Sequence, residues 1–395
     1  MHLTRKEQRI YDGEQGWAYQ VAMKILVKLG DLYGATRLIP IESAHVSGVS
    51  YKTIGDAPIE FLEALAQAGA KARVPSTINP AGFDYGHLAE MAITPAAQEK
   101  QAKVIELYKR MEITSALTCT PYYISEWRRG SHLAWAESSA AVYTNSLLGS
   151  WTNREGGPSA LAAALIGKTP DYGLHRQENR QADIQVKVET KVETDVMYGA
   201  LGLHLGKILE EKVPVIEGLQ SPKEPELKQM GAAIATSGMT SIYHLCDTRP
   251  KRSEKIETLN VGREELEKAF EGLSTTDEEP DMVFIGCPHC SFSEVKQVAD
   301  QIRGRRVQDD IKLWVCTSRR VRENAKDHVE VIENAGGKVL SDTCAIVTWV
   351  KELGVDTLMT NSAKTAYYAP TLNKVQARLC PLNTCINTAL GRHIN

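Results

Sequence analysis

Short apolar segments alternate with longer amphipathic segments along this chain of 395 residues. The short segments have the length of buried strands, and the longer ones repeat apolar side chains at the spacing of a helix face. In residues 16–29, for example, Trp17, Val21, Ile25 and Leu29 follow one another at a spacing of four. Strands that alternate with helices are typical of α/β proteins, whose mainly parallel sheets carry helices on both faces. We therefore predict an α/β fold, with further helices over residues 98–111, 263–271 and 291–302.

One segment departs from this pattern. From Ile184 to Val196, Ile, Val and Thr occupy the even positions, and polar or charged residues occupy the odd ones. Strict alternation describes a strand with one face in the core and one face in water, which is common in antiparallel sheets. We expect this segment to be an antiparallel or edge strand, and so a minor antiparallel element of the fold.

The length of the chain and its hydrophobic content of 43% are sufficient for more than one core. The polar, proline-bearing segment STTDEEPD at residues 274–281 is a plausible boundary between two lobes. We expect an N-terminal lobe, or lobes, of residues 1–275 and a C-terminal lobe of residues 276–395.

Composition narrows the class of partner. The net charge is −3, and the short arginine pairs are scattered, so neither nucleic acid nor an anionic membrane is a favoured partner. The N-terminal sequence MHLTRKEQRI has no apolar stretch of the kind found in secretion signals. No run of about 18 apolar residues is present that could span a membrane. We expect a cytoplasmic protein.

Polar and thiol residues follow five predicted strands at the point where each strand ends. In open α/β sheets, ligands bind outside the carboxyl ends of the strands. Because five strands deliver such residues to this edge, their convergence is a stronger indication of a binding site than any single motif. The five junctions are RLIPIE into Ser43 to Gly48, ITSALT into Cys119 to Tyr122, DMVFIG into Cys287 to Cys290, IKLWV into Cys316 to Ser318, and DTLMT into Asn361 to Thr365.

The sharpest local motif is GCPHC at residues 286–290, one of several places where the eight cysteines occur. Cys287 and Cys290 follow a predicted strand and precede a predicted helix. A helix N-terminus favours the thiolate, which both metal ligation and disulfide exchange require. The motif alone leaves open a metal site, a redox dithiol or a pair of inert core thiols.

Cys119 in TCTPY and Cys344 in SDTCAIV are single thiols, and a lone cysteine is usually a small buried hydrophobe. Together with GCPHC they make three loops that each carry a thiol. Three thiolates can hold a cubane iron–sulfur cluster and leave one iron open as a Lewis acid for a substrate oxygen. Packing is the expected role of Cys316, and Cys246, Cys380 and Cys385 give little indication of a function.

Other segments bear polar groups that could contact a ligand. The small residues Ser47 to Ser50 could wrap an anion with their backbone amides, or form an ordinary tight turn. Lys364 in NSAKT could bind a carboxylate or phosphate, or be a surface lysine without a special role. Residues 132–149 are predicted to be helical, and a turn at Gly156-Gly157-Pro158 leads into another helix. The polar residues of these two segments are Glu137, Ser138, Ser139, Asn145, Asn153 and Arg154.

Taken together, these segments resemble the large-subunit region of aconitase X. The resemblance extends over nearly the whole chain and rests on motifs long enough to be specific. It implies an aconitase-like, multi-lobed fold and a hydro-lyase activity that uses an iron–sulfur cluster held by three cysteines. The motifs are ESAHVSG, TCTPY, AWAESSAAVYTNS, TNREGGPSALAAAL, GCPHCS and NSAKTAYYAP.

The resemblance also implies the residues of the site. The cluster, expected to be [4Fe-4S] with one open iron, would be held by Cys119 in the N-terminal lobe and by Cys287 and Cys344 in the C-terminal lobe. Cys290 would replace Cys287 if the second thiol of GCPHC were the ligand. No catalytic base is identified in this chain. The substrate contacts would be Gly48, Val49, Ser50, Asn79, Pro80, Glu137, Ser138 and Lys364.

Two kinds of substrate are known in the family that the chain resembles. One is cis-3-hydroxy-L-proline. The other is (R)-5-phosphomevalonate, which is dehydrated to trans-anhydromevalonate 5-phosphate in a modified mevalonate pathway. The chain begins with the large-subunit pattern and shows no swivelling domain, which implies a separate small subunit that carries this domain and a serine base. The split organisation favours phosphomevalonate, a small anionic carboxylic acid.

Two hypotheses from other classes make different predictions. A thiol–disulfide oxidoreductase would need only Cys287 and Cys290, so Cys119 and Cys344 could be lost without harm. A non-catalytic protein with a structural zinc site would be colourless and would hold no cluster. The length of the chain and the other strand-end motifs speak against the oxidoreductase.

Overall fold

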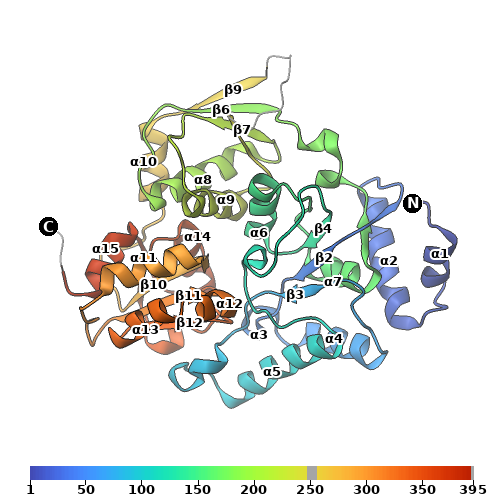
Figure 1. Cartoon of the computed structure of the whole chain (residues 1–395), viewed down its shortest axis with the longest axis horizontal. Coiled ribbons are helices and arrows are strands. Elements are labelled where there is room, and N and C mark those ends of the chain that lie inside the picture. The colour runs from blue at the N-terminus through green and yellow to red at the C-terminus, as the bar shows by residue number, and fades with distance from the viewer. Residues whose placement is uncertain (247–255, 393–395) are drawn as a thin grey trace.

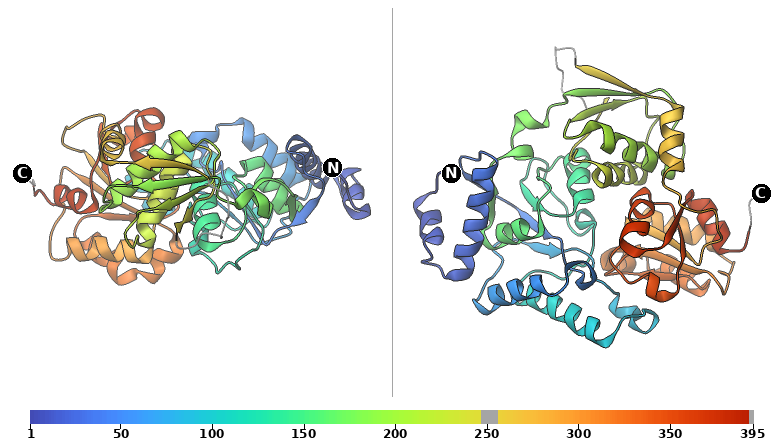
Figure 2. Two further views of the ribbon diagram at one scale, coloured as in Figure 1. Left: turned by 90° about the horizontal axis from the view of Figure 1, so that it is seen from above. Right: turned by 180° about the vertical axis from the view of Figure 1, so that it is seen from behind.

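The computed structural model describes residues 1–246 and 256–392. In these residues the strands form four sheets, of which three are parallel and one, with two strands, is antiparallel. The predicted α/β class with mainly parallel sheets is confirmed, and a minor antiparallel element is present, although not in the segment predicted to form it. Figures 1 and 2 show three groups of elements around a central region, with the N-terminus and helix α15 on opposite sides of the molecule.

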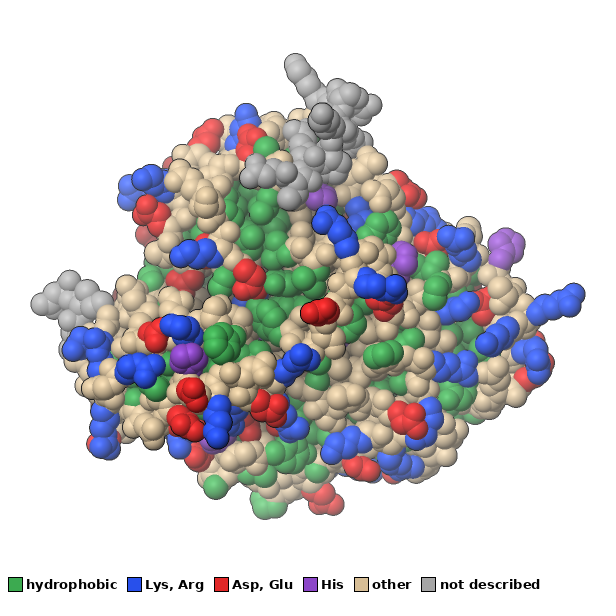
Figure 3. Space-filling view, viewed as in Figure 1, with side chains coloured by type: hydrophobic (Ala, Val, Ile, Leu, Met, Phe, Trp, Pro, Cys, Tyr) green, Lys and Arg blue, Asp and Glu red, His purple; other side chains and the backbone are tan. Residues whose placement is uncertain are grey.

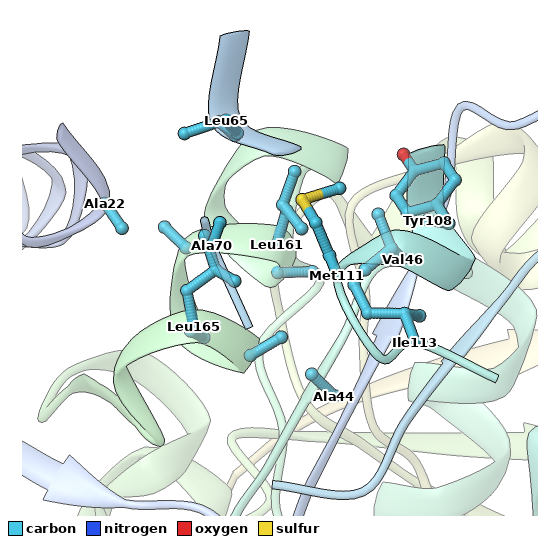
Figure 4. Close-up of a cluster of buried hydrophobic side chains, with 14 of the residues drawn as sticks. Ala22, Ala44, Val46, Leu65, Ala70, Tyr108, Met111, Ile113, Leu161 and Leu165 are labelled. Carbon is cyan, nitrogen blue, oxygen red and sulfur yellow. The ribbon is translucent and has the colours of Figure 1, made fainter. Parts of the chain in front are cut away.

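The N-terminal group is built on a parallel sheet in the order β3-β2-β4. Helices α2 (Trp17–Leu32) and α5 (Pro95–Arg110) confirm two predicted helices. Helix α5 begins where it does because the Thr94 hydroxyl accepts the Ala97 amide hydrogen and a proline follows at the first position. The core between sheet and helices is apolar, as Figure 4 shows. The other elements of this group are β2 (Ser43–Val46), β3 (Ser76–Ile78), β4 (Leu133–Trp135), α1 (Arg5–Tyr11), α3 (Tyr51–Ile54), α4 (Ala57–Gln67) and α7 (Gly157–Ile166).

Two strands predicted in this group differ from the structure. The segment RLIPIE contains β1 (Leu38–Pro40), which pairs antiparallel with β5 (Lys168–Pro170) and ends before the site. The strand that serves the site is β2, so His45 lies within a strand and not after one. The segment ITSALT forms no strand, and Thr114 makes only an isolated bridge to Thr77. Short apolar runs do not reveal their pairing partners, which lie far away in the sequence.

The predicted helix over residues 132–149 is wrong in its first part. Residues Leu133–Trp135 form β4, and helix α6 (Ser138–Tyr143) begins only after Glu137. The Glu137 carboxylate caps this helix by accepting the amide hydrogen of Ser139. The predicted turn at Gly156-Gly157-Pro158 does lead into a helix, α7.

The second group contains a four-stranded parallel sheet in the order β8-β7-β6-β9. The alternating segment forms only β6 (Ile184–Val188), which is central and parallel to both neighbours, so the predicted antiparallel or edge strand over 184–196 is wrong. The alternation of apolar and polar residues indicates that one face of the strand is buried and the other is exposed. It does not indicate the direction of the strand relative to its neighbours. The strand cannot continue to Val196, because the Thr194 hydroxyl caps a helix by accepting the Met197 amide hydrogen. The other elements are β7 (Pro214–Glu217), β8 (His244–Leu245), β9 (Glu257–Val261), α8 (Asp195–Leu209), α9 (Glu224–Ser237) and the predicted helix α10 (Arg263–Glu271).

The C-terminal group is built on a five-stranded parallel sheet in the order β12-β11-β10-β13-β14. Strands β10 (Met282–Cys290), β11 (Lys312–Thr317) and β13 (Thr357–Thr360) confirm three predicted strands. One face packs against α11, α13 and α15, and the other face packs against α14 and parts of α8 and α9. The other elements are β12 (Lys338–Leu340), β14 (Gln376–Leu379), the predicted helix α11 (Phe292–Ile302), α12 (Arg319–Asn324), α13 (Lys326–Asn334), α14 (Ala363–Tyr368) and α15 (Leu382–Ala389).

Strand β10 includes the GCPHC motif, which was predicted to follow the strand, and it bends within this motif. Its pairing register with β11 shifts between Ile285 and Cys290. Gly286 has a φ of +112°, and a Cβ atom there would lie 2.3 Å from the carbonyl oxygen of Cys316. Only glycine satisfies both conditions. After this bend, Cys287 packs in the core cluster on one face of the sheet and Cys290 in the cluster on the other face.

The three groups meet at helix α9, which packs against α8, α6 and α14. Figure 3 shows hydrophobic side chains gathered near the middle of the molecule, over the region where α8, α9 and α6 lie side by side in Figure 1. Among the described helices, none combines the length and the apolar character needed to cross a bilayer.

Candidate active site

Three cysteines from loops far apart in sequence converge beside the C-terminal sheet. Cys119 follows Thr118, whose amide hydrogen bonds to the carbonyl of Ile78 at the end of β3. Cys287 lies at the bend of β10, and Cys344 lies in the turn that follows β12. The three thiols are close enough that a charge on Cys287 or Cys344 raises the pKa of Cys119. Cys119, Cys287 and Cys344 are buried but keep exposed fractions of 7%, 4% and 7%. The exposed fractions of Cys290 and Cys316 are only 1% and 0%.

Burial is the main influence on the pKa of Cys119 and on the pKa of Cys344. It raises the pKa of Cys119, and the negative charges of Glu137, Cys287 and Cys344 raise it further, against the opposing charge of Lys364. Burial also raises the pKa of Cys344 to about 12, with Cys287 adding to the effect and the amides of Ile346 and Val347 opposing it. Such thiols become good ligands only when a strongly positive metal centre displaces their protons.

Cys290 does not join this centre. Its side chain packs among Val295, Val298 and other apolar residues on the far face of the sheet. Burial raises the pKa of Cys290 far above its ordinary value, so the expected lowering by the following helix N-terminus is wrong for this thiol. The helix itself is present, capped by Ser291 and Glu294. Cys287 and Cys290 are both free thiols. A redox dithiol needs a reactive thiolate, and this environment opposes one.

The donor set fits an iron–sulfur cluster. Thiolates are the usual protein ligands of such clusters, and each binds a different iron, so three ligands leave a fourth iron without a protein ligand. In the described part of the chain, no three His, Cys, Asp or Glu side chains are grouped tightly enough to hold one metal ion. The thiols are therefore spaced more widely than the ligands of a mononuclear site. The buried hydroxyl of Thr343, next to Cys344, also has no hydrogen-bond partner within the protein.

A buried ion pair lies beside the three thiols. Lys364, in the first turn of α14, places its Nζ atom 2.7 Å from Oε1 of Glu137. Burial alone would raise the pKa of Glu137, but Lys364 and the hydrogen bonds from Asn79 and Ser139 lower it to about 2. Burial opposes the charge of Lys364 too, yet Glu137 and the neighbouring thiols Cys287 and Cys119 raise the pKa of the lysine. Both side chains are thus charged at neutral pH.

Glu137 is held by a chain of hydrogen bonds that begins in β2 and β3. Asn79 Nδ2 donates to Glu137 Oε2 at 2.7 Å, and Asn79 Oδ1 lies 2.7 Å from His45 Nε2. The Nδ1 atom of His45 lies 2.7 Å from the Thr77 hydroxyl. Since Asn79 Oδ1 can only accept, His45 Nε2 must donate. Burial lowers the pKa of His45 to about 4, so the ring is neutral at neutral pH.

Of the two serines after Glu137, it is Ser139 that contacts the carboxylate. Its hydroxyl donates to Glu137 Oε1 at 2.8 Å. The predicted contact Ser138 is half-buried at the start of α6, next to the ion pair. The roles of His45 and Ser139 could not be found from the sequence, because each depends on a partner brought close by folding.

The predicted anion loop Ser47 to Ser50 packs against the Cys344 turn. The Ser50 hydroxyl donates to the Val347 carbonyl at 2.7 Å. The Val49 side chain is buried in the N-terminal core, and its carbonyl accepts a hydrogen bond from Gln101. Gly48 has a φ of +77°.

The other predicted contact loop and one further lysine border the same turn. Buried Pro80 is followed by Ala81, whose amide donates to the Asp342 carbonyl at 2.6 Å. Sequence reasoning missed Lys52, which reaches from α3 to the Thr348 carbonyl and to Asn373.

Three other polar residues that the sequence predicted near a ligand form hydrogen bonds to the backbone of neighbouring segments and so stabilise the fold. Asn145 bonds to the backbone of Thr152 and Ser241. Asn153 holds the backbone of residues 172–174. Arg154 donates to the Ala235 and Gly238 carbonyls at the end of α9. Asn153 and Arg154 also line a cavity of about 550 Å³ that shares no residue with the three-thiol centre.

Comparison with known proteins gives the class and the family of this chain. It is 44% identical over 390 residues to the phosphomevalonate dehydratase large subunit of Methanocaldococcus jannaschii, covering 95% of this chain and 96% of that protein. It is 34% identical to a cis-3-hydroxy-L-proline dehydratase of Pseudomonas aeruginosa, covering 98% of this chain and 70% of that protein. A crystal structure of Thermococcus kodakaraensis aconitase X in its holo-form superimposes with a TM-score of 0.92 at 43% identity, over 98% of this chain and all of that one.

These relatives are dehydratases, and the chain is accordingly an enzyme of the hydro-lyase class. It matches the family models of the aconitase X first domain at residues 1–178, second domain at 182–271 and third domain at 280–391. The chain belongs to the aconitase X family.

Proposed function

We propose that this chain is the large subunit of a phosphomevalonate dehydratase. The enzyme would remove water from (R)-5-phosphomevalonate to give trans-anhydromevalonate 5-phosphate in a modified mevalonate pathway. The name of the M. jannaschii relative supports this substrate, because that protein matches the chain almost from end to end at 44% identity. The words large subunit in that name support a small-subunit partner, on which we expect the swivelling domain and the serine base.

The convergence of Cys119, Cys287 and Cys344 is the observation that carries the proposal. We assign these three thiols as ligands of a [4Fe-4S] cluster, since each belongs to the same partly open centre. A cluster with one iron free of protein ligands supplies a Lewis acid that makes the substrate hydroxyl a better leaving group.

The other residues of the centre orient the substrate. The Lys364 ammonium has three hydrogens, of which Glu137 accepts one, so it can hold an anionic group of the substrate as well. Asn79 and Ser139 fix the Glu137 carboxylate, and this in turn fixes the position of the ammonium group. The amides of the Ser47 to Ser50 loop are assigned to a second anionic group.

The reaction balances as a loss of water. The base of the small subunit takes the proton from the carbon next to the carboxylate. The electrons of that C–H bond form the carbon–carbon double bond, and the hydroxyl group leaves with the electrons of the broken C–O bond. The proton and the hydroxide together make the water released.

The alternative is the dehydration of cis-3-hydroxy-L-proline. It is favoured by the match to the P. aeruginosa enzyme, but that match has a lower identity and covers less of the relative. Both substrates place a removable hydroxyl near a carboxylate, so the ligand set of the cluster would be the same.

The test is turnover by the complex of this chain with its small subunit, purified without oxygen. We expect conversion of (R)-5-phosphomevalonate to a product lighter by one water in mass spectrometry. Turnover of cis-3-hydroxy-L-proline alone would assign the alternative. Turnover of neither substrate by a complex that holds its cluster would contradict the assignment to both substrates.

A further inference from the structure

His289 lies between all three cysteine loops and is fully buried. It belongs to the loop of Cys287, and its backbone amide donates to Cys119 Sγ at 3.2 Å. Its Nδ1 atom lies 3.0 Å from the hydroxyl of Thr118, the residue before Cys119. Its Nε2 atom lies 2.9 Å from the carbonyl oxygen of Thr343, the residue before Cys344. His289 therefore contacts Cys119 itself and the residues that directly precede Cys119 and Cys344.

The direction of each hydrogen bond follows from the partners. The Thr343 carbonyl can only accept, so His289 Nε2 carries the hydrogen and donates it. The Nδ1 atom of the neutral ring then accepts the hydrogen of the Thr118 hydroxyl. The Thr118 oxygen in turn accepts the amide hydrogen of Thr120 at 3.1 Å. Every polar atom of the imidazole is satisfied, so this buried contact is specific for a ring with one donor and one acceptor.

The backbone of His289 is fixed as well. Its carbonyl accepts a hydrogen bond of 3.0 Å from Lys228 Nζ, and Lys228 is itself buried and paired with Glu294. The ring and the amide of this residue are thus held by the loops of Cys119 and Cys344, and its carbonyl is held by helix α9.

We propose that His289 is a positioning residue that sets the spacing of the three thiols, by joining the Thr118 hydroxyl to the Thr343 carbonyl and by donating its amide hydrogen to Cys119. This inference rests on the proposed cluster and assigns no proton transfer to the ring. Hydrogen bonds to ligand sulfurs influence the reduction potential of a cluster. Loss of the imidazole would shift that potential, because the amide of residue 289 would move relative to Cys119.

The test uses the complex purified without oxygen, with reconstituted cluster, and measures the rate of cluster loss to a chelator and the reduction potential. His289→Phe keeps a ring of similar shape without its nitrogens, and His289→Gln can still donate to Thr343. Thr118→Val removes the hydroxyl partner, and Thr118→Ser retains it. The matched control is His175→Phe, another buried histidine, whose ring contacts His132.

We expect His289→Phe and Thr118→Val to lose the cluster about 10-fold faster than the wild type, as is typical when a residue that orients a metal ligand is replaced. His289→Gln and Thr118→Ser should lie between these variants and the wild type, and His175→Phe should match the wild type. Unchanged cluster loss and potential in Thr118→Val and in a folded His289→Phe would overturn the inference. If His289→Phe does not fold, the Thr118 pair decides, because Ser and Val differ from Thr only in the hydroxyl and methyl groups. A wild-type complex without any cluster would instead refute the proposed function.

Discussion

Lys364 and Glu137 form an ion pair of 2.7 Å whose side chains are only 14% and 11% exposed. Lys364 follows a strand of the C-terminal sheet, and Glu137 follows a strand of the N-terminal sheet. The pair therefore joins two groups of elements directly beside the three thiols. A charge buried in this way is weakly screened, so it depends strongly on its partner.

Removal of one partner should be more harmful than removal of both. Lys364→Met leaves the Glu137 carboxylate buried without its cation and should lower the free energy of unfolding by about 3 kcal/mol. The double variant Lys364→Met, Glu137→Gln should recover part of this loss. Urea unfolding of the wild type, both single variants and the double variant measures the coupling. Additive losses would show that the two charges do not stabilise each other.

The same pair predicts a dependence of stability on pH. The pKa of Glu137 is lowered from 4.5 to about 2, so its contribution is present above pH 4.5 and is lost as the pH falls toward 2. The pKa of Lys364 is raised above 10.5, so its contribution is present below that pH and is lost only at higher pH. Glu137→Gln should therefore flatten the decrease in stability between pH 4.5 and 2. If the stability of Glu137→Gln decreased as steeply as that of the wild type between pH 4.5 and 2, the lowered pKa of Glu137 would be contradicted.

Asn79 should control the charge state of Glu137 through its amide. Asn79→Asp places a second carboxylate against Glu137, which raises the pKa of Glu137 and repels its carboxylate from its present position. We expect a loss of about 100-fold in kcat/KM, in line with a small misplacement of groups that orient a substrate. Asn179→Asp makes the same chemical change at an exposed position and should leave the rate unchanged. Equal rates for the two variants would remove Asn79 from the site.

Lys228 should stabilise the GCPHC loop, although it does not contact a thiol ligand. Burial opposes its charge, but Glu294, Cys290 and Glu224 raise the pKa of Lys228. Lys228→Met leaves Glu294 without its cation and frees the His289 carbonyl, at an expected cost of about 3 kcal/mol in urea unfolding. The matched control is Lys296→Met, which removes an exposed pair with Asp300 on α11 and should not change stability measurably. Similar effects of both variants would contradict the assigned role of Lys228.

Gly286 should be irreplaceable at the bend of β10. Gly286→Ala adds a Cβ atom 2.3 Å from the Cys316 carbonyl at a positive φ, so the strand must shift and Cys287 with it. Gly304→Ala is the control, since Gly304 also has a positive φ but has no atom within 4 Å of the added Cβ. The control carries only backbone strain, of about 1–2 kcal/mol. Thermal unfolding should separate the two variants clearly, and equal melting temperatures would show that the clash is relieved without cost.

Local patterns in the sequence predicted part of this fold. Helices α5, α10 and α11 are confirmed because the apolar spacing that predicts each of them lies within its own segment of the sequence. The segment 184–196 is different: its alternation describes burial of one face, while the direction of β6 depends on β7 and β9, which lie elsewhere in the chain. The residues Leu133–Trp135 are too few for their period to distinguish a strand from a helix.

For the site, too, local motifs in the sequence predicted individual residues, but they did not predict contacts between segments that are far apart in the chain. Cys119, Cys287 and Cys344 were singled out as three thiol-bearing segments, although no strand directly precedes Cys119 and Cys287 lies within β10. The sequence left Cys287 and Cys290 as alternatives, because the bend at Gly286 decides which thiol faces which side of the sheet. His289 was visible only as the histidine of CPHC, since its contacts are 54 and 171 residues away in sequence.

The most direct test of the three-thiol centre is the iron and sulfide content of the complex purified without oxygen. The measurement compares the wild type with Cys287→Ala and with the matched variant Cys290→Ala. We expect a brown wild-type complex with iron and sulfide, an unchanged Cys290→Ala complex and a Cys287→Ala complex that loses its iron. A wild-type complex that stays colourless after anaerobic reconstitution, or a cluster lost with Cys290 and retained without Cys287, would contradict it.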